Sequence, residues 1–223
     1  VLFHKEHGIG TTFITIPALC MFLLLAITST IPVAAEQGWM FRADEAHTGV
    51  YRDSGILPAG EIRWSVYTNG KVSSSPAVSG GVVYVGSDSG YVYALSASNG
   101  TEIWSAYTDG KVSSSPAVSG GVVYVGSDSG YVHALSASNG TEIWSAYTNR
   151  EVRSSPAVSG GVVYVGSDSG YVHALSAADG REIWSVYTNG KVSSSPAVSG
   201  GVVYAGSDSG YVHALSAADG REI

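Results

Sequence analysis

Short apolar runs alternate with glycine-containing turns along most of the chain. In the stretch 72–108 the runs are 72–78 (VSSSPAV), 82–85 (VVYV), 91–95 (YVYAL) and 102–108 (EIWSAYT). Runs this short, rich in β-branched and aromatic residues and without a 3.6-residue period, predict strands rather than helices. Glycine-containing turns between such runs are typical of hairpins. We therefore expect a four-stranded antiparallel meander.

The same unit recurs every 40 residues and makes up most of the sequence. Four tryptophans mark it, and the first two units differ at only three positions. VVYV is apolar at successive positions, so both faces of the sheet must be covered, and neighbouring units have to supply that cover. Leucine-rich and helical repeats lack this pattern. The sequence predicts an all-β fold, a β-propeller of four-stranded antiparallel blades with about four blades present. The units are 64–103, 104–143, 144–183 and 184–223, beginning at Trp64, Trp104, Trp144 and Trp184.

The point within a blade at which the repeats begin and end leaves two alternatives open for the first and last strands. Residues 61–68 (EIRWSVYT) read as an outermost strand that precedes any inner strand, whereas the last unit stops two residues into its outer strand. The first segment therefore either completes the last blade and closes a four-blade ring, or the chain is a fragment of a larger propeller. If the ring stays open, two apolar blade faces are bare, and an oligomer is expected.

The first 35 residues have the layout of a secretory signal. Lys5 precedes an apolar stretch at 11–27, and Val33 and Ala35 occupy the −3 and −1 positions of a cleavage site after Ala35. An uncleaved anchor is the alternative, but the apolar stretch is shorter than the ~20 residues of a spanning helix. We expect 1–35 to be a signal peptide, 36–60 a lead-in segment and 61–223 the propeller. The protein would then be secreted, periplasmic or at the cell surface, contacting membrane only if the signal is uncleaved.

Charge and cysteine content exclude several classes. The net charge is −7 with no basic run, which argues against a nucleic-acid partner. Cys20 is the single cysteine and lies in the signal segment, so an internal disulfide or a cysteine zinc site is excluded.

An eleven-residue motif carries a family resemblance. Residues 94–104 (ALSASNGTEIW) resemble the tryptophan-docking motif of pyrroloquinoline-quinone (PQQ) type propellers, with Ala first, Gly seventh and Trp eleventh. The motif recurs at 134–144 and 174–184, and the resemblance extends over 38–223. It implies docking roles for Trp64, Trp104, Trp144, Trp184, Gly100, Gly140 and Gly180. The third position, usually Asp or Asn in the family, is Ser96, Ser136 and Ser176 here, so we expect a less firmly capped turn.

The resemblance also bears on activity. For quinoprotein dehydrogenases it implies a much longer chain, calcium ligands, a catalytic Asp and a vicinal disulfide, none of which this sequence supplies. We therefore assign no catalytic, cofactor-binding or metal residues. We expect a non-catalytic exported propeller that serves as a protein- or glycan-binding scaffold at the envelope, or an architectural adhesion repeat. The alternative is a fragment of a larger dehydrogenase that uses PQQ and calcium.

Residues of three types, His, Asp and Asn, recur in the units and are candidates for a functional role. His133, His173 and His213 lie on the third strand of successive blades, too far apart to share a metal, so we expect them to be packed. Each SDSG turn has one Asp, expected to bond its own turn rather than calcium; these are Asp88, Asp128, Asp168 and Asp208. Asn99 and Asn139 match the glycosylation pattern, although the turn itself also favours Asn-Gly.

One loop breaks the repeat electrostatically. Where other units read Asn/Asp-Gly-Lys-Val-Ser, the third reads Asn149-Arg150-Glu151-Val152-Arg153. This connection from an outer to an inner strand should emerge beside the SDSG turns. Arg150, Glu151 and Arg153 are therefore a candidate partner-contact patch, with sequence drift in a solvated loop as the alternative.

Overall fold

The computed structural model describes residues 60–223. The expected signal peptide (1–35), its cleavage after Ala35 and nearly all of the lead-in (36–60) lie outside the described residues. Every regular element in the described part is a strand. Within that part, no helix is long and apolar enough to cross a membrane.

Three complete four-stranded antiparallel sheets and a fourth, three-stranded one make up the blades, which confirms the expected all-β propeller architecture. Blade 1 contains β1 (Ala77–Ser79), β2 (Val82–Gly86), β3 (Tyr91–Ser96) and β4 (Glu102–Tyr107). Blade 2 contains β5 (Ala117–Ser119), β6 (Val122–Gly126), β7 (Tyr131–Ser136) and β8 (Glu142–Tyr147). Blade 3 contains β9 (Ala157–Ser159), β10 (Val162–Gly166), β11 (Tyr171–Ser176) and β12 (Glu182–Tyr187). Blade 4 contains β13 (Ala197–Ser199), β14 (Val202–Gly206) and β15 (Val212–Ser216).

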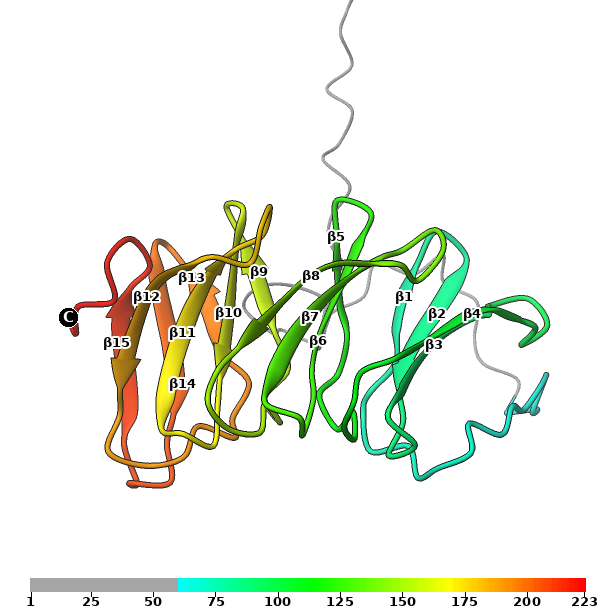
Figure 1. Cartoon of the computed structure of the whole chain (residues 1–223), viewed down its shortest axis with the longest axis horizontal. Helices are drawn as coiled ribbons and strands as arrows, with labels where there is room; N and C mark the ends of the chain where they lie inside the picture. Colours follow the sequence, from blue (N-terminus) through cyan, green and yellow to red (C-terminus); the bar gives the residue numbers. More distant parts are fainter. Residues whose placement is uncertain (1–59) are drawn as a thin grey trace, which may run out of the picture. The chain divides into compact units, whose positions relative to one another are not determined.

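The blades follow one another in chain order, with blade 1 at one end of the row and β15 at the other (Figure 1). The short first strands β1, β5, β9 and β13 contact each other in succession and form the inner edge. Residues 61–68 do not close the ring. That segment has no strand assignment, and its Trp64 indole N–H donates to the Ala97 carbonyl of blade 1 at 3.0 Å. Of the two alternatives left open by the sequence, the one in which this segment completes blade 4 is therefore not formed in the described structure.

The innermost strand is shorter than the sequence predicted, because a serine side chain replaces its strand pairing. A strand was expected over 72–78, but β1 begins at Ala77. The Ser74 hydroxyl donates to the Gly86 carbonyl and accepts from the Gly86 N–H, both at 2.8 Å. Pro76 has no N–H to contribute to a ladder.

The joints between blades are built from tryptophan and glycine. Trp104 of blade 1 packs on Gly140 of blade 2, and its indole N–H donates to the Ala137 carbonyl at 3.0 Å. The Tyr84 hydroxyl donates to the same carbonyl at 3.3 Å. The docking tryptophan therefore rests on the glycine of the next blade, not on that of its own motif. The pairs are Trp64 with Gly100, Trp104 with Gly140, Trp144 with Gly180 and Trp184 with Gly220.

A second set of contacts joins the blades near the inner edge. Val112 packs against Gly86 of the preceding blade so closely that a Cβ there would lie 2.3 Å from its methyl carbon. The Ser75 N–H donates to the Ser115 hydroxyl at 2.8 Å, and Ser115 N–H to Ser155 at 3.0 Å. Each joint thus combines apolar burial with satisfied backbone donors.

A pair of glycine variants tests the tryptophan joint. Gly140 and Gly120 both have positive φ (73° and 57°), so alanine is strained at either position. Only at Gly140 would the new Cβ clash, lying 2.6 Å from the Trp104 ring, whereas Gly120 has nothing within 4 Å. We expect Gly140→Ala to lower the free energy of unfolding by about 1–3 kcal/mol more than Gly120→Ala, measured by urea denaturation. Equal losses would contradict the importance of this contact.

Candidate functional site: the charged loop face

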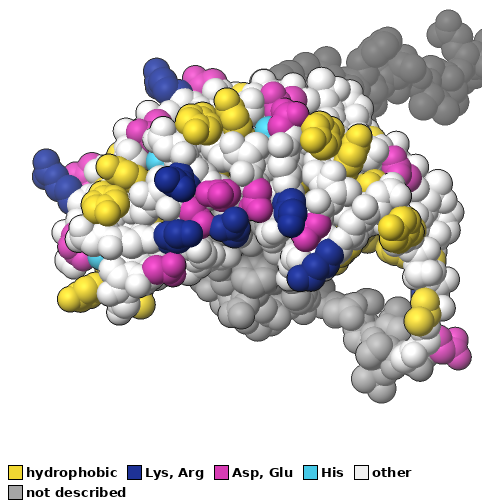
Figure 2. Space-filling view, turned by 60° about the horizontal axis from the view of Figure 1, so that its bottom comes forward, with side chains coloured by type: hydrophobic (Ala, Val, Ile, Leu, Met, Phe, Trp, Pro, Cys, Tyr) yellow, Lys and Arg dark blue, Asp and Glu magenta, His cyan; other side chains and the backbone are white. Residues whose placement is uncertain are grey.

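The SDSG turns and the inter-blade connections lie together at one end of the blades. The Asp88 N–H donates to the Lys71 carbonyl at 2.8 Å, and the Val112 N–H donates to the Ser87 carbonyl at 3.1 Å. Acidic and basic side chains gather on this end (Figure 2). We call it the loop face, defined by the SDSG turns and the connections 68–76, 108–116, 148–156 and 188–196.

Arg153 is the centre of an ion-pair network on the loop face. Its guanidinium Nε lies 3.3 Å from Asp128 Oδ1, and its Nη1 contacts Asp168 Oδ2. Lys191 Nζ lies 3.1 Å from the same Asp168 oxygen, and the Ser193 hydroxyl donates to Asp168 Oδ1 at 3.3 Å. Only 1% of the Asp168 side chain is exposed. Arg153 therefore bridges the turns of blades 2 and 3, and Asp168 is held between two cations.

The carboxylates around Arg153 stabilise its charge. Partial burial of the guanidinium opposes ionisation, but Asp128, Asp168 and Glu151 outweigh that effect and raise the pKa of Arg153 above its ordinary value. The other units carry serine at this position, at Ser73, Ser113 and Ser193. The bridge is thus specific to the third unit.

The three candidate contact residues have different environments. Arg153 is engaged in the network, and Glu151 Oε1 lies 3.9 Å from its Nη2. Arg150 is exposed and forms no ion pair with any residue in 60–223. The structure therefore groups Glu151 with Arg153 and leaves the Arg150 side chain available to a partner.

The aspartates of the SDSG turns do not have the role expected from sequence. The hydroxyl of Ser87 accepts the N–H of Ser89 at 3.2 Å, so serine supports the turn. The Asp168 carboxylate instead receives Arg153, Lys191 and Ser193 from the inter-blade connections. Asp88 and Asp128 likewise face a cation of the following connection, Lys111 and Arg153 respectively.

Each of the three histidines in the described residues pairs within its own blade. His133 Nδ1 lies 2.7 Å from Glu142 Oε2, and its Nε2 lies 3.4 Å from the Ser127 hydroxyl. The trio has the composition of a catalytic triad, but Ser127 is fully buried and its hydroxyl donates to the Thr108 carbonyl at 3.3 Å. No substrate atom has access to it. Sequence reasoning missed the Glu partner, although Glu recurs nine residues after each histidine. The other trios are Ser167, His173 and Glu182, and Ser207, His213 and Glu222.

The glycosylation candidates lie at the opposite end of the blades. Asn99 and Asn139 are exposed, and each side-chain oxygen accepts the N–H of the threonine two residues later, at 3.0 and 3.1 Å. Both asparagines therefore serve the turn, and glycosylation remains a prediction.

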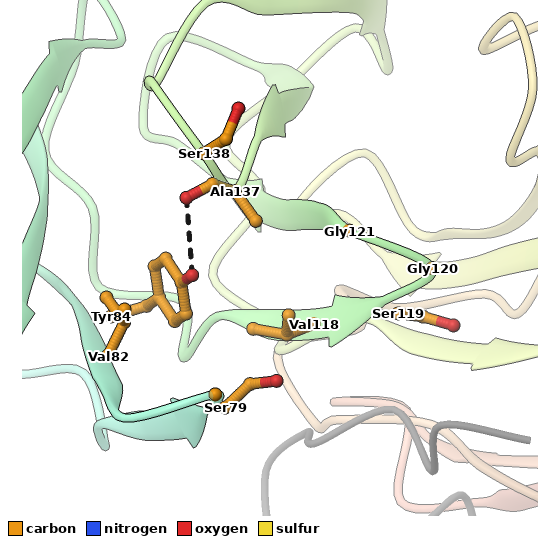
Figure 3. Close-up of a pocket in the computed structure, with 10 residues that line it drawn as sticks. Ser79, Val82, Tyr84, Val118, Ser119, Gly120, Gly121, Ala137 and Ser138 are labelled. Carbon is orange, nitrogen blue, oxygen red and sulfur yellow. Dashed lines mark hydrogen bonds between the residues drawn. The ribbon is translucent and has the colours of Figure 1, made fainter. Parts of the chain in front are cut away.

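A cleft of about 460 Å³ also lies at this opposite end, between blades 1 and 2 (Figure 3). The β1–β2 and β5–β6 hairpins line it, and the Tyr84 hydroxyl points across it to the Ala137 carbonyl. Its described lining has no ionisable group other than the Tyr84 phenol, whose pKa burial raises above 10.0. The cleft carries no evident chemistry.

Replacing Arg153 with the serine of the other units tests the network. We expect Arg153→Ser to lower the free energy of unfolding by about 1 kcal/mol at low salt, because two turns lose their bridge. The loss should shrink at higher ionic strength, because salt screens exposed charges. Arg150→Gly, which also restores the residue of the other units, is the control and should stay within about 0.5 kcal/mol. Chemical denaturation at two salt concentrations measures both, and a salt-independent loss would contradict the electrostatic account.

His173 gives a pH-dependence test. Burial lowers the pKa of His173 below 6.5, and the hydrogen bond to Glu182 offsets this only partly. Below about pH 6.5 the unfolded chain therefore binds the proton more readily, and stability falls as the pH falls. Blade 1 has Tyr93 at this position. We expect the free energy of unfolding of His173→Tyr to fall less than that of the unchanged chain when the pH is lowered from 7.5 to 5.5, measured from denaturation curves at each pH. Equal losses in the two proteins would contradict this.

Comparison with known proteins places the chain. The sequence profile of the family described as outer membrane protein assembly factor BamB matches residues 55–150 and 128–223. A comparison with curated proteins gives no match.

Solved structures share the architecture. BamB from Moraxella catarrhalis is similar with a TM-score of 0.64 and 25% identity, over 73% of this chain and 55% of that chain. Quinohemoprotein alcohol dehydrogenase from Comamonas testosteroni gives 0.68 and 19%, over 85% and 41%. The computationally designed Ika4 protein gives 0.64 and 17%, over 70% and 98%. The last two likenesses show the fold alone, and this chain spans about half the length of the BamB that it matches. Because the family profile covers well over half of its residues, the chain belongs to the BamB family of PQQ-like β-propeller repeat proteins.

Proposed function

We propose that this chain is a non-catalytic, exported propeller that binds a protein partner at the cell envelope through its loop face. The observation that carries the proposal is the departure of the third unit at Arg150, Glu151 and Arg153, on a face of otherwise repeated loops. A BamB is described as an outer membrane protein assembly factor, which is a role among proteins. The proposed location rests on the expected signal at 1–35.

The loop face suits a protein partner better than a glycan. Its distinctive side chains are charged, and those of Lys111 and Lys191 are more than half exposed. The tryptophans that would stack on a sugar are instead buried in the joints, as with Trp104 at 7% exposure. A fixed array of exposed charges favours orientation and specificity in protein association.

The dehydrogenase alternative has less support. The likeness to the quinohemoprotein alcohol dehydrogenase reflects fold alone at 19% identity. In the part of the chain that the structure describes, no group of three or more His, Cys, Asp or Glu side chains is arranged to hold a metal ion. The most buried carboxylate on the loop face, Asp168, is already paired with Arg153 and Lys191. Our proposal therefore assigns no PQQ or calcium to these residues.

Site-specific photo-crosslinking tests the proposed face. The experiment places a photo-crosslinking amino acid at position 111 of the protein in intact cells of the organism that makes it. Illumination should then yield a discrete protein adduct, whereas the same amino acid at Ile143, on the outer rim, should not. Changing Arg150→Gly, Glu151→Lys and Arg153→Ser together restores the repeat sequence. We expect this triple variant to reduce the adduct about tenfold, because the distinctive contacts are lost.

The matched control restores the repeat elsewhere in the same unit. Asp179→Asn with Arg181→Thr gives the third unit the Asn-Gly-Thr of the first two units, at the opposite end of the blade, and should leave the adduct unchanged. An undiminished adduct in the triple variant would overturn the patch. Stoichiometric quinone absorbance after addition of PQQ and Ca²⁺ would favour the dehydrogenase instead.

A further inference from the structure

Asn-Gly pairs occur in two different kinds of turn. Two of them, at 69–70 and 189–190, lie in the connections of the loop face, and two, at 99–100 and 139–140, lie in the docking turns at the opposite end of the blades. An asparagine followed by glycine can lose its side-chain amide without an enzyme, because glycine has no side chain to shield its backbone nitrogen. The two kinds of turn therefore set the same chemistry in two different environments.

In the docking turns, both reacting groups are held. The Gly100 N–H donates to the Ser96 carbonyl at 2.8 Å. The Asn99 side-chain oxygen accepts the Thr101 N–H at 3.0 Å. The Trp64 ring also covers this glycine, since a Cβ on Gly100 would lie 2.7 Å from it. The Gly100 nitrogen therefore approaches the Asn99 side chain only after these contacts break. The same contacts hold Asn139 and Gly140, through Ser136, Thr141 and Trp104.

In the connections of the loop face, the same two groups are free. Asn189 is exposed, and within residues 60–223 neither its side chain nor the Gly190 N–H has a hydrogen-bond partner. The turn is closed instead by the Thr188 hydroxyl, which donates to the Gly190 carbonyl at 3.1 Å. This bond leaves the backbone nitrogen of Gly190 unoccupied. The pair Asn69 and Gly70 has the same arrangement, with the Thr68 hydroxyl on the Gly70 carbonyl at 3.2 Å.

The second unit shows that an aspartate fits this turn. Its residue at the equivalent position is Asp109, whose φ is 57°, against 59° for Asn189. The Thr108 hydroxyl donates to the Gly110 carbonyl at 3.1 Å, as in the turn at Asn189. Conversion of Asn189 to aspartate therefore keeps the turn and adds a negative charge to the loop face.

The third unit has the same turn without the reactive pair. Asn149 adopts the same left-handed conformation, with a φ of 69°, but Arg150 follows it in place of glycine. The side chain of Arg150 crowds the backbone nitrogen that would have to attack. This turn is therefore a natural control for the chemistry of the other two.

We propose that Asn69 and Asn189 are sites of spontaneous deamidation, which adds negative charge to the loop face as the protein ages. At Asn189, the Gly190 nitrogen forms a bond to the side-chain carbonyl carbon and closes a cyclic succinimide. The C–N bond of the side-chain amide breaks, and ammonia leaves with the proton given up by the Gly190 nitrogen. Water then adds to one of the two imide carbonyls and breaks its bond to nitrogen. The whole reaction consumes one water and releases one ammonia.

The two possible products affect the turn differently. Opening of the ring at the side-chain carbonyl gives aspartate, which the turn accepts as it accepts Asp109. Opening at the main-chain carbonyl gives isoaspartate, which lengthens the main chain between Thr188 and Gly190 by one carbon. Gly190 lies against the SDSG turn of blade 4, so closely that a Cβ on it would be 2.5 Å from the Ser209 nitrogen. Isoaspartate therefore disturbs this contact.

Incubation of the folded full chain at mildly alkaline pH tests the proposal. The tryptic peptides 182–191 and 72–111 each contain one asparagine, Asn189 and Asn99 respectively. Mass spectrometry follows each reaction as a gain of about 1 Da. We expect Asn189 to react about tenfold faster than Asn99 or more, because two hydrogen bonds and a tryptophan contact must first break at Asn99. In the chain unfolded in urea, the two rates should converge.

Arg150→Gly gives the third unit the reactive pair. We expect deamidation of Asn149 to rise about tenfold, toward the rate at Asn189, because the crowding side chain is gone. Arg153→Ser is the matched control, since it changes the same loop but leaves Arg150 in place, and the rate at Asn149 should not change. Fragment ions distinguish Asn149 from Asn139, which lies in the same peptide.

Two results would overturn the proposal. One is equal rates at Asn189 and Asn99 in the folded chain, which would mean that the fold does not select between the pairs. The other is an unchanged rate at Asn149 in Arg150→Gly, with the fold intact by circular dichroism. No binding partner enters the experiment, so its outcome is independent of the proposed function.

Discussion

Every other feature of this propeller depends on the joint between successive blades. Each sheet is apolar on both faces, so no blade can bury its core alone. The joint solves this with a tryptophan on a glycine, a valine on a second glycine and a tyrosine that shares an acceptor with the tryptophan. The glycines are required because the neighbouring blade occupies the space of their Cβ atoms. These close contacts thereby set the spacing between adjacent blades.

That fixed spacing is what gives the loop face its chemistry. Arg153 reaches Asp128 and Asp168 because successive SDSG turns are held one blade apart by the joint. The substitution of a serine by arginine in one unit therefore creates both a structural bridge and a local asymmetry. Arg153 is largely committed to the bridge. Under the proposed function, recognition of a partner therefore falls to the neighbouring exposed charges, with Arg150 the clearest case.

Sequence was informative about what repeats within a unit and less so about what connects units. Strand positions and turns followed from the apolar runs and glycines, because these are local constraints. The shortened inner strand did not, because the Ser74 hydroxyl replaces backbone pairing at Gly86. The pairing of His133 with Glu142 depends on a bulge between Ala134 and Leu135 that shifts the register. The contacts of Arg153 and the docking of Trp104 on the next blade needed the blade-to-blade geometry.

Near-identity of the units has a consequence for the geometry of the blade row. The three joints between blades 1 and 4 use the same contacts, a tryptophan on one glycine and a valine on another. Because the same residues make each joint, each joint imposes nearly the same rotation from one blade to the next. The exact repeat in sequence is therefore also a repeat in space, and an asymmetric feature of the loop face has to come from a unit whose residues differ, as the third unit does at Arg153.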